Sequence, residues 1–301
     1  MAVMAVVLVS LSALLHALWN FFGKKSGSSP AFFAVSFITT PLLAVPLVWQ
    51  YFSQLPGLPV LFWQLVLASG VMQAWYMWSL ARAYATGDIS IAYPLARALP
   101  LIIVTVTTVL LGHYQSVSYL GVLGIMAIVV GSLLLPMKHL KDFSWRHYAN
   151  QSTLFALCAA CGTAGYSIFD DRAVKLLAEV RQLLSDGDIS LLYIWLQSVA
   201  AALLMTLQHC CTVKMRSEFR QALTEQLLWA TVTGVIIMVT YMLILWSMQY
   251  VENVSYVVAF RQLSIPIGVL LGVLFLGEHF HIPKRLGTVL ISAGLVAVAL
   301  G

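Results

Sequence analysis

Much of the fold follows from one segment, WSLARAYATGDISIAYPLARALPLIIVTVTTVLLGH (residues 78–113), and from its partial repeat, WSMQYVENVSYVVAFRQLSIPIGVLLGVLFLGE (residues 246–278). Both segments begin with Trp-Ser, carry an arginine about halfway along, and end in an apolar run that closes with Leu-Gly. The matched arginines are Arg97 and Arg261. Two segments that share this order of features indicate an internal repeat within the chain.

The composition excludes a water-soluble protein. The 301 residues are 61% hydrophobic and only 9% charged, and their mean hydropathy is +0.91. Soluble domains are usually about a quarter charged, so a soluble globular protein, a nucleic-acid-binding domain and a disordered chain are all excluded. The net charge of +5 fits lysines and arginines in loops that face an acidic lipid leaflet. We therefore predict an all-α polytopic membrane protein that contacts the lipid bilayer and no nucleic acid.

Apolar runs of about 20 residues, the length that a helix needs to cross a bilayer, follow one another along the whole chain. The runs cover residues 3–23, 31–52, 61–84, 89–111, 117–136, 152–172, 189–209, 227–250, 253–276 and 284–301. These runs predict ten transmembrane helices and leave no stretch for a soluble domain.

The repeat divides the ten predicted helices into two halves of five, residues 1–147 and 148–301. A weaker match between ALWNFFGKK (17–25) and AGYSIFDDR (164–172) supports the same division. Because five is an odd number, the two halves must enter the membrane in opposite orientations. Inverted repeats of this kind place a binding site near the middle of the bilayer, where the halves meet.

The loop charges predict an orientation. Excluding the two arginines within predicted spans, eleven basic residues fall on one side of the membrane and three fall on the other. The three on the minority side are Arg172, Lys175 and Arg181. The positive-inside rule then places the larger group in the cytoplasm and both termini outside. We expect a multi-pass protein of the inner (cell) membrane.

Arg97 and Arg261 are the strongest candidates for substrate binding. An arginine near the centre of a membrane helix costs roughly 2.5–3.5 kcal/mol on insertion scales, so it should face a cavity or a partner. The acidic residues nearest to these depths are all expected near span ends: Asp170, Asp171, Glu252 and Glu278. An incoming anion is therefore the expected counter-ion, and the guanidinium fork suits a carboxylate, phosphate or sulfonate. The alternative is a snorkelling or internally paired arginine.

Aromatic and polar side chains gather in the predicted spans around the arginines. His16 and Asn20 are four residues apart and therefore share one helix face. The candidates for the walls of a substrate site are His16, Trp19, Asn20, Trp75, Tyr76, Tyr93, Tyr166, Tyr241 and Tyr256. For each aromatic residue, a place in the interfacial belt or in helix packing is the alternative. For His16 the alternative is an interhelical hydrogen bond.

Prolines flank both arginines. Pro94 and Pro100 lie on either side of Arg97, and Pro266 follows Arg261 by five residues. Proline removes a helix hydrogen bond and clashes with the preceding turn. We therefore expect both arginine-bearing helices to bend or open at the site.

Signatures of enzymes are missing from the sequence. It contains no HExxH, no G-x-S-x-G and no Walker glycine loop. Cys158 and Cys161 form a CxxC, but this motif lies within an apolar run, where small residues usually pack helices together. We predict no catalytic residue, no metal site and no cofactor. The lack of an acidic residue near the middle of any predicted span also argues against a carboxylate-based proton relay.

With ten predicted spans in two halves, the chain resembles the EamA-type branch of the drug/metabolite transporter superfamily. Members close their fourth and ninth spans with a proline, apolar residues and Leu-Gly-Glu. The segment RQLSIPIGVLLGVLFLGEHF (261–280) is similar to that pattern, whereas YPLARALPLIIVTVTTVLLGH (93–113) departs from it with His113 in place of the glutamate. HALWNFFGKK (16–25) resembles the first-span signature. The resemblance implies secondary transport or exchange of small metabolites by alternating access, and it implies no particular substrate.

These observations predict a secondary transporter or exchanger for a small metabolite that carries an anionic group, with the two arginines binding that group. One alternative is an exporter of amino acids or apolar drugs in which the arginines are structural. An alternative from another class is an integral-membrane enzyme that acts on lipid. Its candidate catalytic pairs are Asp170 with Asp171 and His279 with His281.

Overall fold

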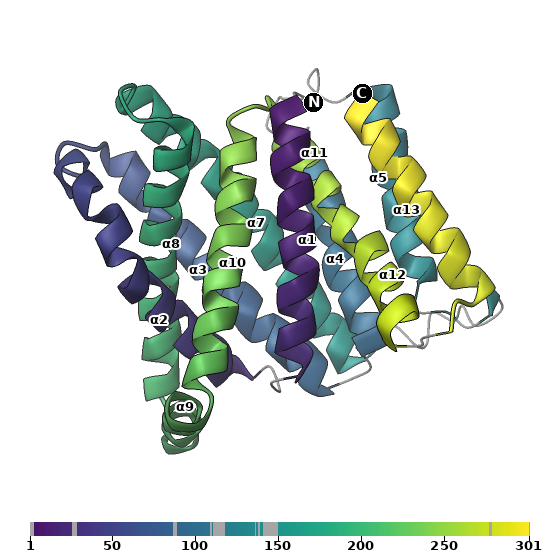
Figure 1. The fold of residues 1–301 in the computed structure, drawn as a ribbon, viewed down its shortest axis with the longest axis horizontal. Coiled ribbons are helices and arrows are strands. Elements are labelled where there is room, and N and C mark those ends of the chain that lie inside the picture. The colour runs from purple at the N-terminus through teal and green to yellow at the C-terminus, as the bar shows by residue number, and fades with distance from the viewer. Residues whose placement is uncertain are drawn as a thin grey trace.

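The computed structural model describes residues 3–25, 29–86, 89–108, 110, 118–135, 137, 139–140, 150–276 and 279–300. Within these residues, all regular secondary structure is helical (Figure 1). The first part of the chain forms α1 (Val3–Lys25), α2 (Pro30–Val48), α3 (Val60–Thr86), α4 (Ile89–Thr108) and α5 (Tyr119–Leu134). The second part forms α7 (Gln151–Val180), α8 (Asp186–Cys210), α9 (Val213–Glu225), α10 (Leu227–Met248), α11 (Val254–Phe260), α12 (Ser264–Leu276) and α13 (Ile282–Leu300). The structure also has two 3₁₀ helices. The first, η1 (Trp49–Gln54), follows α2, and the second, η5 (Arg261–Leu263), joins α11 to α12.

The structure confirms an all-helical, membrane-type protein. Among the described residues, six helical segments are long and apolar enough to cross a bilayer: Pro30–Gln54, Val60–Ala83, Gln151–Val180, Asp186–Cys210, Leu227–Met248 and Ile282–Leu300. Shorter apolar helices cover Val3–Ala17, Ala98–Thr107, Tyr119–Leu134 and Val254–Leu270. Each of the ten predicted apolar runs therefore coincides with helix.

Helix starts follow from local sequence. At α2, the Ser29 hydroxyl accepts a hydrogen bond from the backbone N–H of Phe32 at 3.1 Å, and Pro30 occupies the first helical position. At α7, the Asn150 side chain accepts from the N–H of Thr153 at 2.9 Å. These caps satisfy amide donors that the first turn of a helix leaves without partners.

Helix α7 is longer than the predicted run 152–172, because it continues to Val180 over 30 residues. The added residues, AVKLLAEV (173–180), follow the charged DDR (170–172) and are rich in strong helix formers, so they extend the helix instead of ending it. Asp170 consequently lies well inside a packed helix, where its exposed fraction is 0%. The prediction that acidic residues lie only near span ends is wrong at this position.

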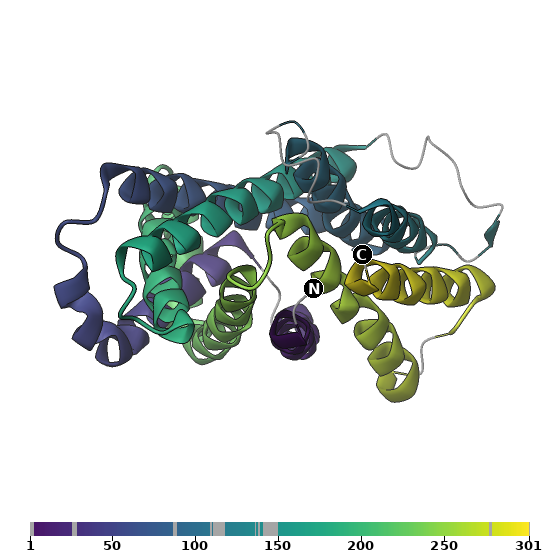
Figure 2. The ribbon, with the colours of Figure 1, turned by 90° about the horizontal axis from the view of Figure 1, so that it is seen from above.

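The helices of the two sequence halves are interleaved. α3 packs on α7 and α8, α1 packs on α10, and α5 packs on α13. α5 and α13 stand together at one end of the molecule, and α2, α3 and α8 gather at the other (Figures 1 and 2). The first turn of α1 and the last turn of α13 lie at the same edge (Figure 1).

Glycines permit the closest of these contacts. A Cβ atom on Gly294 of α13 would lie 2.5 Å from the backbone oxygen of Gly124 in α5. A Cβ atom on Gly70 of α3 would lie 2.6 Å from the Cβ of Ala200 in α8. Both separations are too short for carbon–carbon or carbon–oxygen contacts, so a larger residue would push the helices apart.

Polar bonds join the α2–α3 and α7–α8 connections at the edge that also holds both chain ends (Figure 1). The Tyr51 hydroxyl donates to Asp188 Oδ1 at 2.5 Å. Arg181 Nε donates to the backbone oxygen of Gln54 at 2.9 Å, and its Nη2 donates to that of Pro56 at 2.7 Å. We call this set of bonds the edge clamp.

Candidate functional site

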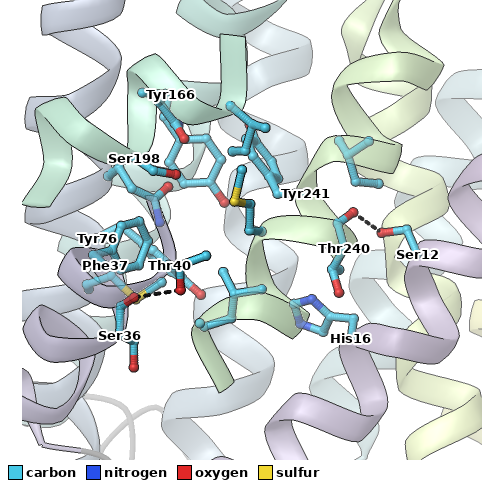
Figure 3. Close-up of a pocket in the computed structure, with 18 of the residues that line it drawn as sticks. Ser12, His16, Ser36, Phe37, Thr40, Tyr76, Tyr166, Ser198, Thr240 and Tyr241 are labelled. Atoms are coloured by element: carbon cyan, nitrogen blue, oxygen red, sulfur yellow. Dashed lines mark hydrogen bonds between the residues drawn. The ribbon is translucent and has the colours of Figure 1, made fainter. Parts of the chain in front are cut away.

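A cavity lies between α1, α2, α3, α7, α8, α10 and η5 (Figure 3). It holds about 720 Å³ of empty space, including the part that opens to the outside. Its lining residues are Ser12, Ala13, His16, Ser36, Phe37, Thr40, Gln73, Tyr76, Met77, Tyr166, Ile194, Gln197, Ser198, Gly234, Ile237, Met238, Thr240, Tyr241, Ile244 and Arg261. This mixture of apolar, aromatic and hydrogen-bonding groups suits a small metabolite.

Arg261 enters the cavity from an interruption in the helix. α11 ends at Phe260, the 3₁₀ turn η5 carries the arginine, and α12 begins at Ser264. The chain stays helical through this turn, and the change from α to 3₁₀ geometry is the local irregularity that the structure shows beside Pro266. At the matched position, α4 runs without a break through Arg97.

The Arg261 guanidinium has one unused donor. Its Nη2 donates to the Tyr166 hydroxyl at 3.2 Å, while its buried Nη1 has no hydrogen-bond partner among the described residues. No described carboxylate lies within ion-pair distance of it. A buried charged donor without a partner is costly, so a bound acceptor in the cavity would be favourable here.

Three tyrosines surround this guanidinium group. The Tyr76 and Tyr166 rings meet at a centroid separation of 5.8 Å, and the Tyr166 and Tyr241 rings meet edge to face at 5.4 Å. The Arg261 Cζ lies 5.3 Å from the Tyr241 ring centroid and 5.9 Å from that of Tyr166. Such cation–π contacts fix the direction of an arginine without neutralising its charge.

Asp170 lies beside this group but within a separate set of bonds. Its Oδ1 accepts hydrogen bonds from the Ser69 hydroxyl and from the Tyr193 hydroxyl, the latter at 2.6 Å. Its Oδ2 accepts from the Tyr241 hydroxyl at 2.5 Å and from Gln197 Nε2 at 3.3 Å. Donors from α3, α8 and α10 therefore replace the water that a carboxylate needs.

The opposite end of the cavity is rich in hydroxyl groups (Figure 3). The Ser12 hydroxyl donates to the backbone oxygen of Thr240 at 2.8 Å, and the Thr40 hydroxyl donates to that of Ser36, also at 2.8 Å. His16 joins this wall from α1. Hydroxyl oxygens retain acceptor capacity after donating, so this end can accept hydrogen bonds from a ligand.

Five of the predicted site residues meet in the cavity: His16, Tyr76, Tyr166, Tyr241 and Arg261. The side chains of Trp19, Asn20, Tyr93 and Arg97 lie outside the described part of the structure, as do His113 and Glu278.

Two predicted residues lie away from the cavity. Trp75 is 47% exposed, and its indole N–H donates to the backbone oxygen of Cys158 at 3.0 Å. Tyr256 is buried, and its hydroxyl accepts from the backbone N–H of Ser118 at 2.9 Å. The contacts of both residues are those of helix packing.

Two glutamines that line the cavity are not among the predicted site residues, and neither is Asp170, which lies beside the cavity. Gln73 and Gln197 line the cavity from α3 and α8, and both are buried. An available signal was their position within apolar runs, because a polar amide in a membrane helix is uncommon and needs partners. The hydroxyl-bearing residues carry a weaker signal, since serine and threonine are common in helix packing.

The described residues contain no group of three or more His, Cys, Asp or Glu residues placed to hold a metal ion. Cys158 and Cys161 are free cysteines. For binding, the cavity offers one cation, several hydroxyl groups and aromatic walls.

Comparisons with known proteins indicate the family and the fold. A family model described as the EamA-like transporter family matches residues 150–300. A solved crystal structure, 17% identical in sequence, matches over 98% of this chain and 96% of its own length with a TM-score of 0.67. The comparison with curated proteins gives no match.

Proposed function

The chain belongs to the EamA-like transporter family, and from this premise we propose that it is a secondary transporter or exchanger for a small metabolite with an anionic group. We place it in the inner membrane, with alternating access as its mechanism. Membership of this family makes it a multi-pass membrane transporter and not a lipid-modifying enzyme.

The observation that carries the anionic substrate is the unused donor of Arg261. The cavity lining contains one arginine and no Asp or Glu among the described residues. Asp170 is the nearby carboxylate, but it faces hydroxyl and amide donors and forms no ion pair with the arginine. A carboxylate, phosphate or sulfonate group could bind Nη1 while Tyr166 holds Nη2.

The rest of the substrate would contact the tyrosine rings and the hydroxyl-rich wall. Tyr76, Tyr166 and Tyr241 supply flat apolar surface, and His16 supplies a further polar group. We also propose substrate contacts for the four residues whose side chains lie outside the described part, namely Arg97, Trp19, Asn20 and Tyr93.

The pattern of helix contacts supports ten spans in two inverted repeats, residues 1–147 and 148–301. In that arrangement α1 to α5 correspond in order to α7, α8, α10, α11 with α12, and α13. If each helix is replaced by its counterpart in the other half, every contacting pair should become another contacting pair. The pair α1–α10 becomes α7–α3, the pair α2–α10 becomes α8–α3, and the pair α4–α7 becomes α12–α1. All of these pairs are in contact, as are α2–α8 and α5–α13, which map onto themselves. A two-fold axis would produce this set of contacts.

The alternative, an exporter of amino acids or apolar drugs, requires a structural Arg261. The contacts of this arginine with Tyr166 and Tyr241 would be the same in that case. Removing the charge distinguishes the two functions, because a substrate-binding arginine is needed for uptake and a structural arginine is needed for stability.

The test is uptake and thermal stability measured on the same purified variants in proteoliposomes. Arg261→Gln should weaken anion binding on the order of a hundredfold, because a charge-assisted bond in a low-dielectric site is worth a few kcal/mol. Arg261→Lys should restore binding only in part, because lysine lacks the fork. Arg285→Gln is the control, since the Arg285 guanidinium also donates one hydrogen bond, to the backbone oxygen of Phe280, and lies over the ring of that residue, but lies outside the cavity. Normal uptake by a destabilised Arg261→Gln protein would instead identify a structural arginine.

A further inference from the structure

Asp170 is the buried group that the anion site leaves unused. Among the described residues, it is the one Asp, Glu, Lys or Arg that is buried. Two of its four hydrogen-bond donors, Tyr241 and Gln197, also line the cavity. A change of charge in the cavity therefore reaches this carboxylate through side chains that contact both.

Tyr241 stands between the two opposite charges. Its hydroxyl donates to Asp170 Oδ2 at 2.5 Å, and its ring lies 5.3 Å from the Arg261 Cζ. Without a bound anion, the positive charge of Arg261 partly compensates the negative charge of Asp170 across Tyr241, although the two groups form no ion pair. An anion bound to Arg261 would remove that compensation and leave an unbalanced negative charge in a low-dielectric region, which is costly.

We propose that Asp170 is the coupling-proton site of the transporter, which takes up a proton as an anion binds Arg261 and releases it as the anion leaves. This proposal rests on the proposed function of Arg261. The proton comes from water and forms an O–H bond with Asp170 Oδ2, and the Tyr241 hydroxyl changes from donor to acceptor. One positive charge enters the protein with each negative charge, so the loaded site keeps the net charge of the empty one.

The helices packed against α7 are α3, α4, α8, α10 and α11. The charged or titratable groups that act on Asp170 are Tyr193 of α8, Tyr241 of α10 and Arg261 of η5. Tyr76 of α3 contacts the Tyr166 ring of α7, and the Asp171–Lys175 ion pair lies on α7 itself. The Tyr256 hydroxyl of α11 bonds the Ser118 amide. On α4, the side chain of Arg97 lies outside the described part. Across the cavity, His16 is the competing candidate, because histidine generally titrates near neutral pH.

The experiment measures binding of methanesulfonate, whose charge is fixed, to the purified protein from about pH 5 to about pH 8 by isothermal titration calorimetry. Low pH supplies the proton that binding requires, so the affinity should rise as the pH falls. The expected rise is about tenfold, the effect of two unit charges about 10 Å apart at an effective dielectric constant of about 20. Titrations in two buffers of different ionisation enthalpy should also show net proton uptake.

Two variants assign the effect to one residue. Asp170→Asn resembles the protonated carboxyl, so it should bind methanesulfonate at every pH without proton uptake. His16→Gln alters the cavity wall, so its affinity for methanesulfonate is compared only with itself across the pH range, and it should keep both the pH dependence and the proton uptake. If Asp170→Asn does not fold, the wild type and His16→Gln decide, because loss of proton uptake in the latter assigns the proton to His16.

The outcomes separate this proposal from the anion site itself. If Arg261→Gln abolishes binding but the wild type binds methanesulfonate equally strongly at both pH limits, the proton site is overturned and the proposed function stands. Proton uptake that persists in Asp170→Asn, or an affinity that follows sodium concentration and not pH, also overturns it. Failure of methanesulfonate, benzenesulfonate and sulfate to bind at any pH overturns the anion site and the proton site together.

Discussion

Replacing Gly70 by alanine should separate α3 from α8 next to the side chains that donate hydrogen bonds to Asp170. The added Cβ would lie 2.6 Å from the Cβ of Ala200, and 3.1 Å and 3.2 Å from the backbone C of Ala200 and N of Ala201. Since carbon atoms pack at about 3.5–4.0 Å, the helices must move apart by about 1 Å. One residue earlier, Gln197 Nε2 donates to the Ser69 hydroxyl at 3.0 Å. A shift of that size would take this bond beyond hydrogen-bonding distance.

The cost can be worked from these contacts. Overpacking a core typically costs 1–3 kcal/mol, and loss of a buried hydrogen bond adds about 1 kcal/mol. The better helix propensity of alanine returns roughly 0.5–1 kcal/mol. We therefore expect Gly70→Ala to lower the free energy of unfolding by about 1–3 kcal/mol and to weaken substrate binding as well.

Gly268→Ala in α12 is the matched control. A Cβ at Gly268 meets nothing within 4 Å, so this variant should be as stable as the wild type or slightly more stable. Both variants would be unfolded by denaturant in the same detergent, and binding would be measured in parallel. Equal stability of Gly70→Ala and Gly268→Ala would refute the reasoning, because it would mean that α3 and α8 are not held at this distance.

Two further predictions concern residues outside the cavity. Tyr256→Phe removes the acceptor of the Ser118 amide, so thermal denaturation should show a loss of about 1 kcal/mol while specific uptake stays normal; reduced uptake by the folded variant would return Tyr256 to the substrate site. Asn150→Ala removes the cap that accepts from Thr153, and it should likewise cost about 1 kcal/mol of stability. Unchanged stability of this variant would show that water serves the first turn of α7 equally well.

The sequence was sufficient for the class of fold, because apolar runs in a membrane are read by length and hydropathy alone. It also singled out Arg261 and three tyrosines that line the cavity, since an arginine and tyrosines within an apolar run are unusual enough to be noticed; their role in binding stays a prediction. It failed at Asp170 because DDRAVKLLAEV combines charge with high helix propensity. Hydropathy ends the span there, whereas backbone hydrogen bonding continues the helix.

Side-chain direction was the second limit of sequence reasoning. Trp75 and Tyr76 are adjacent in α3, yet the first bonds a backbone oxygen of α7 on the exposed side and the second faces the cavity. Successive helix residues point about 100° apart, so only the packing partner decides which of the two reaches a substrate. That partner is fixed by close glycine contacts, such as Gly162 of α7 against Tyr76, which composition and periodicity do not reveal.

The edge clamp has a consequence for the populations of the transport cycle. Under the proposed alternating access, an opening that separates the α2–α3 connection from the α7–α8 connection would break the bonds from Tyr51 to Asp188 and from Arg181 to Gln54 and Pro56. At roughly 1 kcal/mol or more for each bond, the three together favour the closed edge by on the order of 3 kcal/mol. With a bias of that size, about one molecule in a hundred or fewer is in the conformer that is open at this edge. A substrate arriving from this side would then meet a rare conformer, and its apparent affinity would be lower there than at the opposite face by the same factor.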